Sequence, residues 1–251
     1  MYKIKMLMLI LLMFSLSLSA TVLEVGLGQD FTYNTIQSAV DAVVDYDTVL
    51  VHPGRYLENV EVLEKSLTLG SLFLTTGDEA YIDSTIIDGN DEWRVLFFKH
   101  NRYLPSVKWV NVSGLSITNG NTLTNHNSLP EGVSTHGGGI AINGYSYQNQ
   151  QISIIEYCKI YNSTSRSGGG VAVVESNIKM QSCEIFDNNG GQKGGGFYCV
   201  GLDYQLEFST EHPNSIYNNS AGRGRDIFGG TINTNPAQIN GLYFDRNHPC
   251  L

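Results

Sequence analysis

Short stretches in which apolar and polar residues alternate recur along this chain, and each of them ends in Asn or Asp. They are Ser116–Asn119, Lys159–Asn162, Glu184–Asp187 and Ser215–Asn218. Alternation with a period of two is typical of β-strands, whose successive side chains point to opposite faces. These repeats have no helical periodicity, so the pattern predicts short strands joined by tight turns.

Glycine triplets mark a second repeat, in step with the first. Gly137–Gly139, Gly168–Gly170 and Gly194–Gly196 each precede an apolar residue and lie 31 and 26 residues apart. A period of about 20–50 residues indicates stacked copies of one supersecondary unit. Because the unit consists of strands and turns, the repeat predicts an all-β solenoid of the parallel β-helix type. One rung of its core is expected to contain Ile140, Ile142, Val171, Val173, Phe197 and Cys199.

Further strands and loops follow from the same alternation. Strands are expected at Thr21–Gly28, Asp47–Val51, Asn59–Leu63, Ser66–Leu69, Ser84–Ile87, Arg94–Phe98, Val107–Val110, Gly114–Ile117 and Gly241–Phe244. The polar stretches 119–134 and 145–151 are expected to project as loops. Residues 239–251 either fold over the last coil or mark the chain as a fragment of a longer protein, and we favour the fragment.

One short helix is expected before the coils. Asn34 is the predicted N-cap, with Gln37 three positions later. Ile36, Ala39 and Val40 share one helical face. Such a helix would cover the first coil, which otherwise exposes apolar side chains and an unpaired strand edge.

The first 20 residues have the pattern of a secretory signal peptide. Lys3 and Lys5 precede the apolar run Met6–Leu18, and Ser17–Ala20 supplies small residues for cleavage. The run is shorter than the roughly 20 residues of a membrane-spanning helix, so a retained anchor is the less favoured alternative. We expect one β-helix domain over residues 21–251, exported to the medium or the cell surface, with no membrane span after signal removal.

The charge of the chain limits the classes of molecule that it is expected to bind. The formal net charge is −9, and cleavage of the signal would remove two more lysines. An acidic chain without a Lys/Arg cluster argues against nucleic acid as a partner, and less strongly against polyanionic sugars.

Two cysteines are expected in the core. Cys158 and Cys183 each precede an inward Ile by two residues, so they are expected there either as free thiols, which we favour, or as a disulfide. The sequence contains no CxxC pair, so it gives no indication of a zinc site.

Several segments resemble a known superfamily. Phe31–Val40 followed by Asp47–Tyr56 resembles the N-terminal part of pectin-lyase-like, right-handed parallel β-helix proteins. Thr85–Gly89 and Val112–Gly120 are similar to secreted bacterial proteins of that fold. Phe186–Asn189 also resembles the FxxN step of polymorphic outer-membrane proteins, as Gly138–Ile140 resembles their glycine step. The resemblance implies a right-handed β-helix, whereas activity stays open because this fold hosts lyases, hydrolases, esterases and adhesins.

The enzymatic branches of the superfamily match only in part. Gly54–Glu58 fits the GxYxE step of pectin methylesterases, and Asp226–Gly229 is similar to part of their DFIFG motif, but the QDT and LGRPW steps are missing. His136-Gly137 is the nearest fragment of a polygalacturonase GHG step. Arg223 and Arg225 form a basic pair without the carboxylates of a pectate lyase. The GxYxE match is more simply interpreted as a turn with an inward aromatic.

No metal, cofactor or catalytic site is predicted. Asp88–Asp91 has some features of a calcium loop but lacks its spacing and bidentate Glu, so a turn is expected. The six histidines have no metal-ligand spacing. Asn162, Asp187 and Asn218 are expected to form a structural ladder at the turns.

One surface remains as a candidate site. With Ile160, Ile185 and Ile216 pointing inward, the residues that follow them, Tyr161, Phe186 and Tyr217, point outward on successive coils. Stacked rings could offer an apolar face to sugars or proteins. Alternatively, they pack beneath a loop or stabilise the coil stack. We therefore expect an exported, non-catalytic surface or adhesion module that binds glycan or protein, with a polysaccharide lyase or esterase as the alternative.

Overall fold

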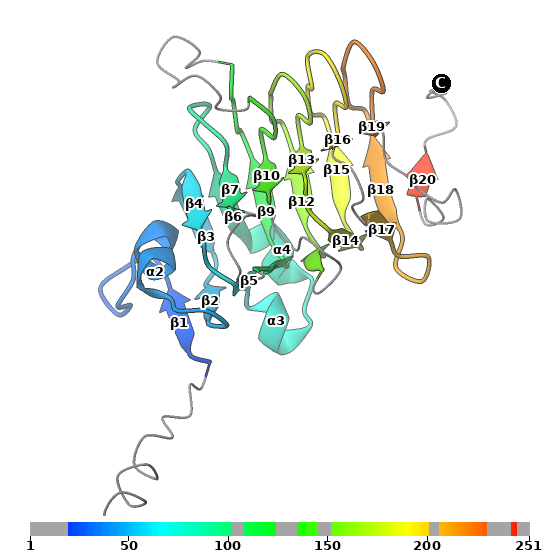
Figure 1. Cartoon of the computed structure of the whole chain (residues 1–251). Coiled ribbons are helices and arrows are strands. Elements are labelled where there is room, and N and C mark those ends of the chain that lie inside the picture. The colour runs from blue at the N-terminus through cyan, green and yellow to red at the C-terminus, as the bar shows by residue number, and fades with distance from the viewer. Residues whose placement is uncertain are drawn as a thin grey trace, which may run out of the picture.

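The computed structural model describes residues 20–101, 108–123, 135–144, 152–200, 206–229 and 242–244. These residues form three parallel sheets in which strands from successive coils pair in register (Figure 1). The chain is therefore the right-handed parallel β-helix that its repeats and its resemblance predicted. Among the described residues, no helix combines the length and hydrophobicity needed to cross a bilayer.

Each complete coil contributes one strand to each sheet. Sheet A contains β1 (Val22–Val25), β2 (Thr48–Val51), β5 (Leu67–Ser71), β8 (Val110–Ser113), β11 (Ser153–Glu156), β14 (Ile178–Gln181) and β17 (Leu206–Phe208). Sheet B contains β3 (Gly54–Leu57), β6 (Thr85–Asp88), β9 (Ser116–Thr118), β12 (Lys159–Tyr161), β15 (Glu184–Phe186), β18 (Asn214–Tyr217) and β20 (Leu242–Phe244). Sheet C contains β4 (Val60–Leu63), β7 (Leu96–Lys99), β10 (Ile140–Asn143), β13 (Val171–Val174), β16 (Phe197–Val200) and β19 (Ile227–Gly229).

The core consists of files of apolar side chains that run along the solenoid. On sheet B the file is Tyr56, Ile87, Ile117, Ile160, Ile185 and Ile216, all in register and buried. The six residues expected from the glycine repeat are likewise buried on sheet C. They occupy three successive coils rather than one rung, because Ile140, Val171 and Phe197 are register partners.

The Asn or Asp that ends each repeat has a backbone role. Asn119, Asn162, Asp187 and Asn218 have φ angles of 57°, 53°, 55° and 55°, in the left-handed region. Asn and Asp tolerate this conformation better than other residues with a side chain. The glycine triplets serve a different need, since a Cβ on Gly138 would lie 2.6 Å from the carbonyl oxygen of Gly169 on the next coil.

The expected capping helix is present as α2 (Ile36–Ala42) at the N-terminal end of the stack (Figure 1). It buries Ile36, Ala39 and Val40 against the first coils. The N-cap is Thr35 rather than Asn34, because Thr35 Oγ1 accepts from Ser38 N at 3.2 Å. Asn34 instead donates to the carbonyl oxygen of Gly26 at 3.0 Å.

Two short helices were not expected, α3 (Phe73–Thr76) and α4 (Ala80–Ser84), which lie between β5 and β6. The Phe73 ring packs on Tyr157, with 4.6 Å between ring centroids. Two strand boundaries were also wrong. The strand expected at Val107–Val110 is β8, which starts at Val110, and the one expected from Arg94 is β7, which starts at Leu96.

Some expectations fall outside the described residues. These are the signal peptide before Ala20, the loop from residue 124, the loop at 145–151, and the C-terminal end apart from β20, whose strand was expected. The core thiols are confirmed, since Cys158 and Cys183 are buried and free, as is Cys199. The Cys183 thiol donates to the Ile155 carbonyl oxygen at 3.5 Å.

Candidate functional site

Tyr161, Phe186 and Tyr217 project from the outer face of sheet B, as expected. They are register partners on β12, β15 and β18, and each is half-buried. Neighbouring rings are nearly parallel, with interplanar angles of 5° and centroid distances of 5.1 Å and 5.3 Å. We call these three residues the aromatic stack.

The aromatic stack presents ring edges rather than one flat face. Parallel rings lying side by side in a single plane would collide at centroid distances near 5 Å, so the rings are stacked face on face with an offset. Both faces of Phe186 are therefore covered by the two tyrosines. The surface left for a partner consists of ring edges, which carry the positive end of the ring quadrupole, and of the tyrosine hydroxyls. Such a surface attracts electron-rich oxygen atoms.

Charged side chains border the aromatic stack. Lys159 and Glu184 lie two residues before the rings and face outward with them. Lys159 forms an ion pair with Asp83 of α4 at 2.5 Å, and this hydrogen bond raises the lysine pKa. Burial, together with the negative charges of Glu184 and Asp187, raises the pKa of the Tyr217 hydroxyl. The Tyr217 hydroxyl is thus a protonated donor at neutral pH.

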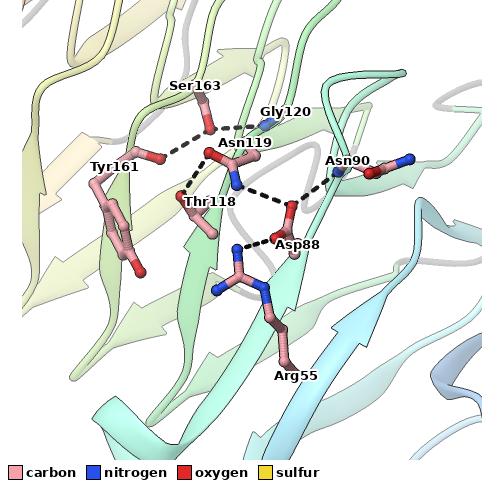
Figure 2. A network of polar contacts seen from close by, with 8 residues as sticks. All are labelled: Arg55, Asp88, Asn90, Thr118, Asn119, Gly120, Tyr161 and Ser163. Carbon is pink, nitrogen blue, oxygen red and sulfur yellow. Dashed lines mark hydrogen bonds and ion pairs between the residues drawn. The ribbon is translucent and has the colours of Figure 1, made fainter.

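The register positions of the aromatic stack on sheet B hold polar residues on the preceding coils, and these residues belong to a polar network. Thr118 and Asp88 are the register partners of Tyr161 on the two preceding coils, β9 and β6 (Figure 2). Asp88 is 3% exposed and forms an ion pair with Arg55 of β3. Its Oδ1 atom accepts hydrogen bonds from Asn119 Nδ2 at 3.1 Å and from the backbone N–H of Asn90 at 2.9 Å.

The contacts of this network engage the Asp88 carboxylate in structural bonds. Three donors hold the carboxylate, and a buried charge is stable only when it is paired in this way. The backbone amide of Asn90 turns back onto Asp88, so Asp88–Asp91 forms the expected turn. Within the described part of the chain, no three His, Cys, Asp or Glu side chains converge as metal ligands. Sequence reasoning treated this segment as a turn and did not foresee its contact with Arg55.

The GxYxE step has a structural explanation. Tyr56 points into the core, and its hydroxyl donates to the His52 carbonyl oxygen at 2.8 Å; burial raises its pKa to about 12. The Glu58 carboxylate accepts from the backbone N–H groups of Ile36 and Gln37 at 2.8 Å and 2.9 Å. Both residues therefore hold the first coil and its helix together.

Asp226 belongs to a buried polar ladder that the sequence analysis missed. Asn219 donates to Asp226 Oδ1 from both its backbone N and its Nδ2, at 3.2 Å and 2.9 Å. One coil earlier, Asn188 donates to Asn219 Oδ1 from the same two atoms. The signal was available, because Asn188 and Asn219 each follow an aromatic residue of the stack by two positions.

The carboxylates of Asp88 and Asp226 lie far apart. Asp88 ends β6, whereas Asp226 is bonded to the turn after β18, and four steps along sheet B separate these strands. At ~4.8 Å per step, the two turns are roughly 19 Å apart along the solenoid. They cannot act together on one ester or glycosidic bond.

Comparison with known proteins identifies no family for this chain. No protein-family model matches, and no curated protein is a sequence match. Among solved structures, Escherichia coli YbhC is similar over 84% of this chain and 68% of its own, with 15% identity and a TM-score of 0.40. The deglycosylated pectin methylesterase of Aspergillus niger is similar over 90% and 71%, with 15% identity and a TM-score of 0.37.

A third solved structure is a pectin methylesterase variant in complex with a hexasaccharide. It is similar over 84% of this chain and 81% of its own, with 8% identity and a TM-score of 0.39. The chain's own three parallel sheets establish the β-helix, and its activity must be argued from its own residues.

Proposed function

We propose that this chain is an exported, non-catalytic surface module that binds a glycan through the aromatic stack of Tyr161, Phe186 and Tyr217. The observation that carries the proposal is the parallel arrangement of three half-buried rings on the outer face of sheet B. Stacking alone would be satisfied by fully covered rings. These rings are instead only half-buried, so their outer parts can contact a partner along the axis of the solenoid.

The chemistry of the stack suits a sugar chain. Ring edges and tyrosine hydroxyls attract the hydroxyl and ring oxygens of saccharides. The rings repeat every 5.1–5.3 Å, a spacing similar to that of sugar units in an extended polysaccharide. A glycan lying parallel to the solenoid would therefore meet equivalent groups on successive coils. The signal-like pattern of residues 1–20 supports export of the module to the cell surface or the medium.

The alternative is a polysaccharide lyase or esterase. Its supporting observation is Asp88, a carboxylate paired with Arg55 in the same row as the aromatic stack (Figure 2). Against it, the three donors on Asp88 leave the carboxylate committed to structural bonds, and Asp226 is four coils away. Binding without turnover is therefore the better-supported function.

The binding test compares the native protein with a triple variant in which Tyr161, Phe186 and Tyr217 are each replaced by Ser. Affinity is measured on a glycan array and with purified polysaccharides, alongside a melting curve. Loss of binding in a folded triple variant supports the proposal, whereas unchanged binding overturns it. Tyr46→Ser is the control, because Tyr46 is a 53% exposed tyrosine outside the stack.

A milder variant keeps the test decisive if the triple variant fails to fold. Replacing Tyr161 and Tyr217 by Phe preserves the stacked rings and removes both hydroxyls. We expect glycan affinity to fall about tenfold, the equivalent of about 1.4 kcal/mol for two lost hydrogen bonds. An unchanged affinity in this folded variant would exclude the hydroxyls as contacts.

The enzymatic alternative has its own assay. Purified protein is incubated with polygalacturonate and with its methyl ester, with and without calcium, and unsaturated product and methanol are recorded. We expect neither product. Release of either one that is lost in Asp88→Asn would establish the enzyme and overturn the non-catalytic assignment.

A further inference from the structure

The outer face of sheet C carries a buried arginine. Arg94 is 2% exposed and precedes β7. Its guanidinium carbon lies 4.5 Å from the ring centroid of Trp93 and 4.6 Å from that of Phe97. No carboxylate in the described part of the chain forms an ion pair with it. Cation–π contacts offset part of the desolvation of this charge, but they supply no hydrogen-bond acceptor for the guanidinium N–H groups.

Two nitrogen atoms at this place are buried and have no hydrogen-bond partner in the part of the chain that the structure describes. Arg94 Nε donates to the His136 carbonyl oxygen at 2.9 Å, whereas Arg94 Nη1 has no hydrogen-bond partner among the described residues. His136 Nδ1 is also buried, and it too has no partner among these residues. Leaving such groups unsatisfied is costly, and native proteins rarely do so without a ligand, an ion or water at the site.

The surrounding side chains strengthen the positive field. His136 lies against Tyr198 of β16, with 5.0 Å between ring centroids. Burial, followed by the positive charges of Arg94, Arg166 and Lys193, lowers the His136 pKa to about 4. Burial also lowers the Arg94 pKa to about 10, with Glu61 as the opposing negative charge.

We propose that Arg94 and His136 form a binding site for an oxyanion, that is, a carboxylate, sulfate or phosphate group. An arginine is always a donor and never an acceptor, so its free Nη1 can be satisfied only by an acceptor. In the tautomer that carries its proton on Nδ1, His136 supplies a second donor. An oxyanion accepts from both groups and neutralises the Arg94 charge, which a neutral or cationic ligand cannot do.

This site is independent of the aromatic stack. Arg94 and His136 lie on the side of sheet C, whereas the stack lies on sheet B. Failure of one proposal leaves the other unaffected. Carboxylate and sulfate groups occur on sugars, and phosphate groups occur on lipids and nucleotides. All of them are oxyanions, which is the chemistry that the site would recognise. The test below compares the three anions and so separates them.

The first test is thermal denaturation with sodium sulfate, phosphate or acetate, with ionic strength held constant by sodium chloride. A ligand that binds the folded state raises the melting temperature with its concentration. We expect such a rise with at least one oxyanion, and an apparent affinity about tenfold weaker or worse in Arg94→Met, the factor equivalent to about 1.4 kcal/mol. Arg225→Met is the matched control, since Arg225 lies four coils away and is exposed.

A second measurement uses the native protein and does not depend on the variant folding. The pKa of His136 is followed by NMR, with its signals assigned from a His136→Gln spectrum. A bound oxyanion offsets the nearby positive charges, so sulfate or phosphate should raise this pKa from about 4. The NMR signals of His52 should show no such response to the anion. If no oxyanion changes the His136 pKa or the melting temperature beyond the chloride reference, the proposal is overturned.

Discussion

The Glu58 carboxylate accepts a hydrogen bond from the backbone N–H of Ile36 at 2.8 Å, across 22 residues of sequence. This contact joins the segment after β3 to the start of α2, and a second bond to Gln37 N completes it. A residue that matches an esterase motif thus anchors the N-terminal cap. The positive end of the peptide dipoles in α2 favours a carboxylate at this position.

Removing the Glu58 carboxylate should loosen the cap. Glu58→Ala leaves two backbone N–H groups without their charged acceptor, and we expect a loss of about 1.5–3 kcal/mol in the free energy of unfolding. Glu58→Gln keeps an uncharged acceptor and should lose less. Urea denaturation measures both. Equal stabilities for Glu58→Ala and the native protein would show that the helix is held by its apolar face alone.

The buried ladder predicts opposite outcomes for two adjacent asparagines. Asn219 is buried and bonded to Asn188 and Asp226, so Asn219→Ala should cost about 1–3 kcal/mol for each partner left unsatisfied. Asn218 is exposed at a φ of 55° and should tolerate Gly without loss. Chemical denaturation of both variants gives the comparison. A destabilised Asn218→Gly beside a stable Asn219→Ala would contradict the ladder.

Inward and outward positions on strand β13 should respond differently to a new charge. Val171 is fully buried, and Val171→Asp places an unpaired charge in the core at a cost of about 3–5 kcal/mol. Val174 on the same strand is half-buried and outward, so Val174→Asp should cost far less. Circular dichroism melting curves distinguish the two. A Val171→Asp protein with a native melting temperature would mean that this file does not face the core.

His136 makes stability depend on pH. Its pKa is about 4 in the fold against 6.5 in an unfolded chain, so the unfolded state binds more protons between these values. The stability contributed by neutral His136 is complete above pH 6.5 and is lost as the pH falls toward 4. His136→Gln should flatten this part of the stability profile relative to the native protein. His52→Gln serves as the control, and identical profiles for all three proteins would rule out His136 as the titrating group.

The core thiols should resist labelling. Burial raises the pKa of Cys183 well above its usual value and that of Cys199 to about 12, so neither forms the reactive thiolate at neutral pH. Mass spectrometry after iodoacetamide treatment should detect Cys158, Cys183 and Cys199 unmodified in the native state and all modified in denaturant. A peptide pair two mass units low would reveal a disulfide between Cys158 and Cys183.

The sequence by itself determined the repeating part of this protein. Alternation placed Ile160, Ile185 and Ile216 in one core file, and Asn or Asp marked the left-handed turn after each strand. These features are local, because strand alternation and backbone sterics act within a few residues. The in-register coils then follow from repetition of the same unit.

The tertiary structure alone decided what the outward side chains do. Glu58 meets Ile36, Asp88 meets Arg55, and Arg94 meets His136 across 22 to 42 residues, and no local pattern reports such contacts. The stack shows the same limit, since alternation put its three rings outside but did not reveal that they cover each other's faces. Outward groups from distant coils are brought together only by the stacking distance and the side-chain rotamers, which the completed solenoid sets.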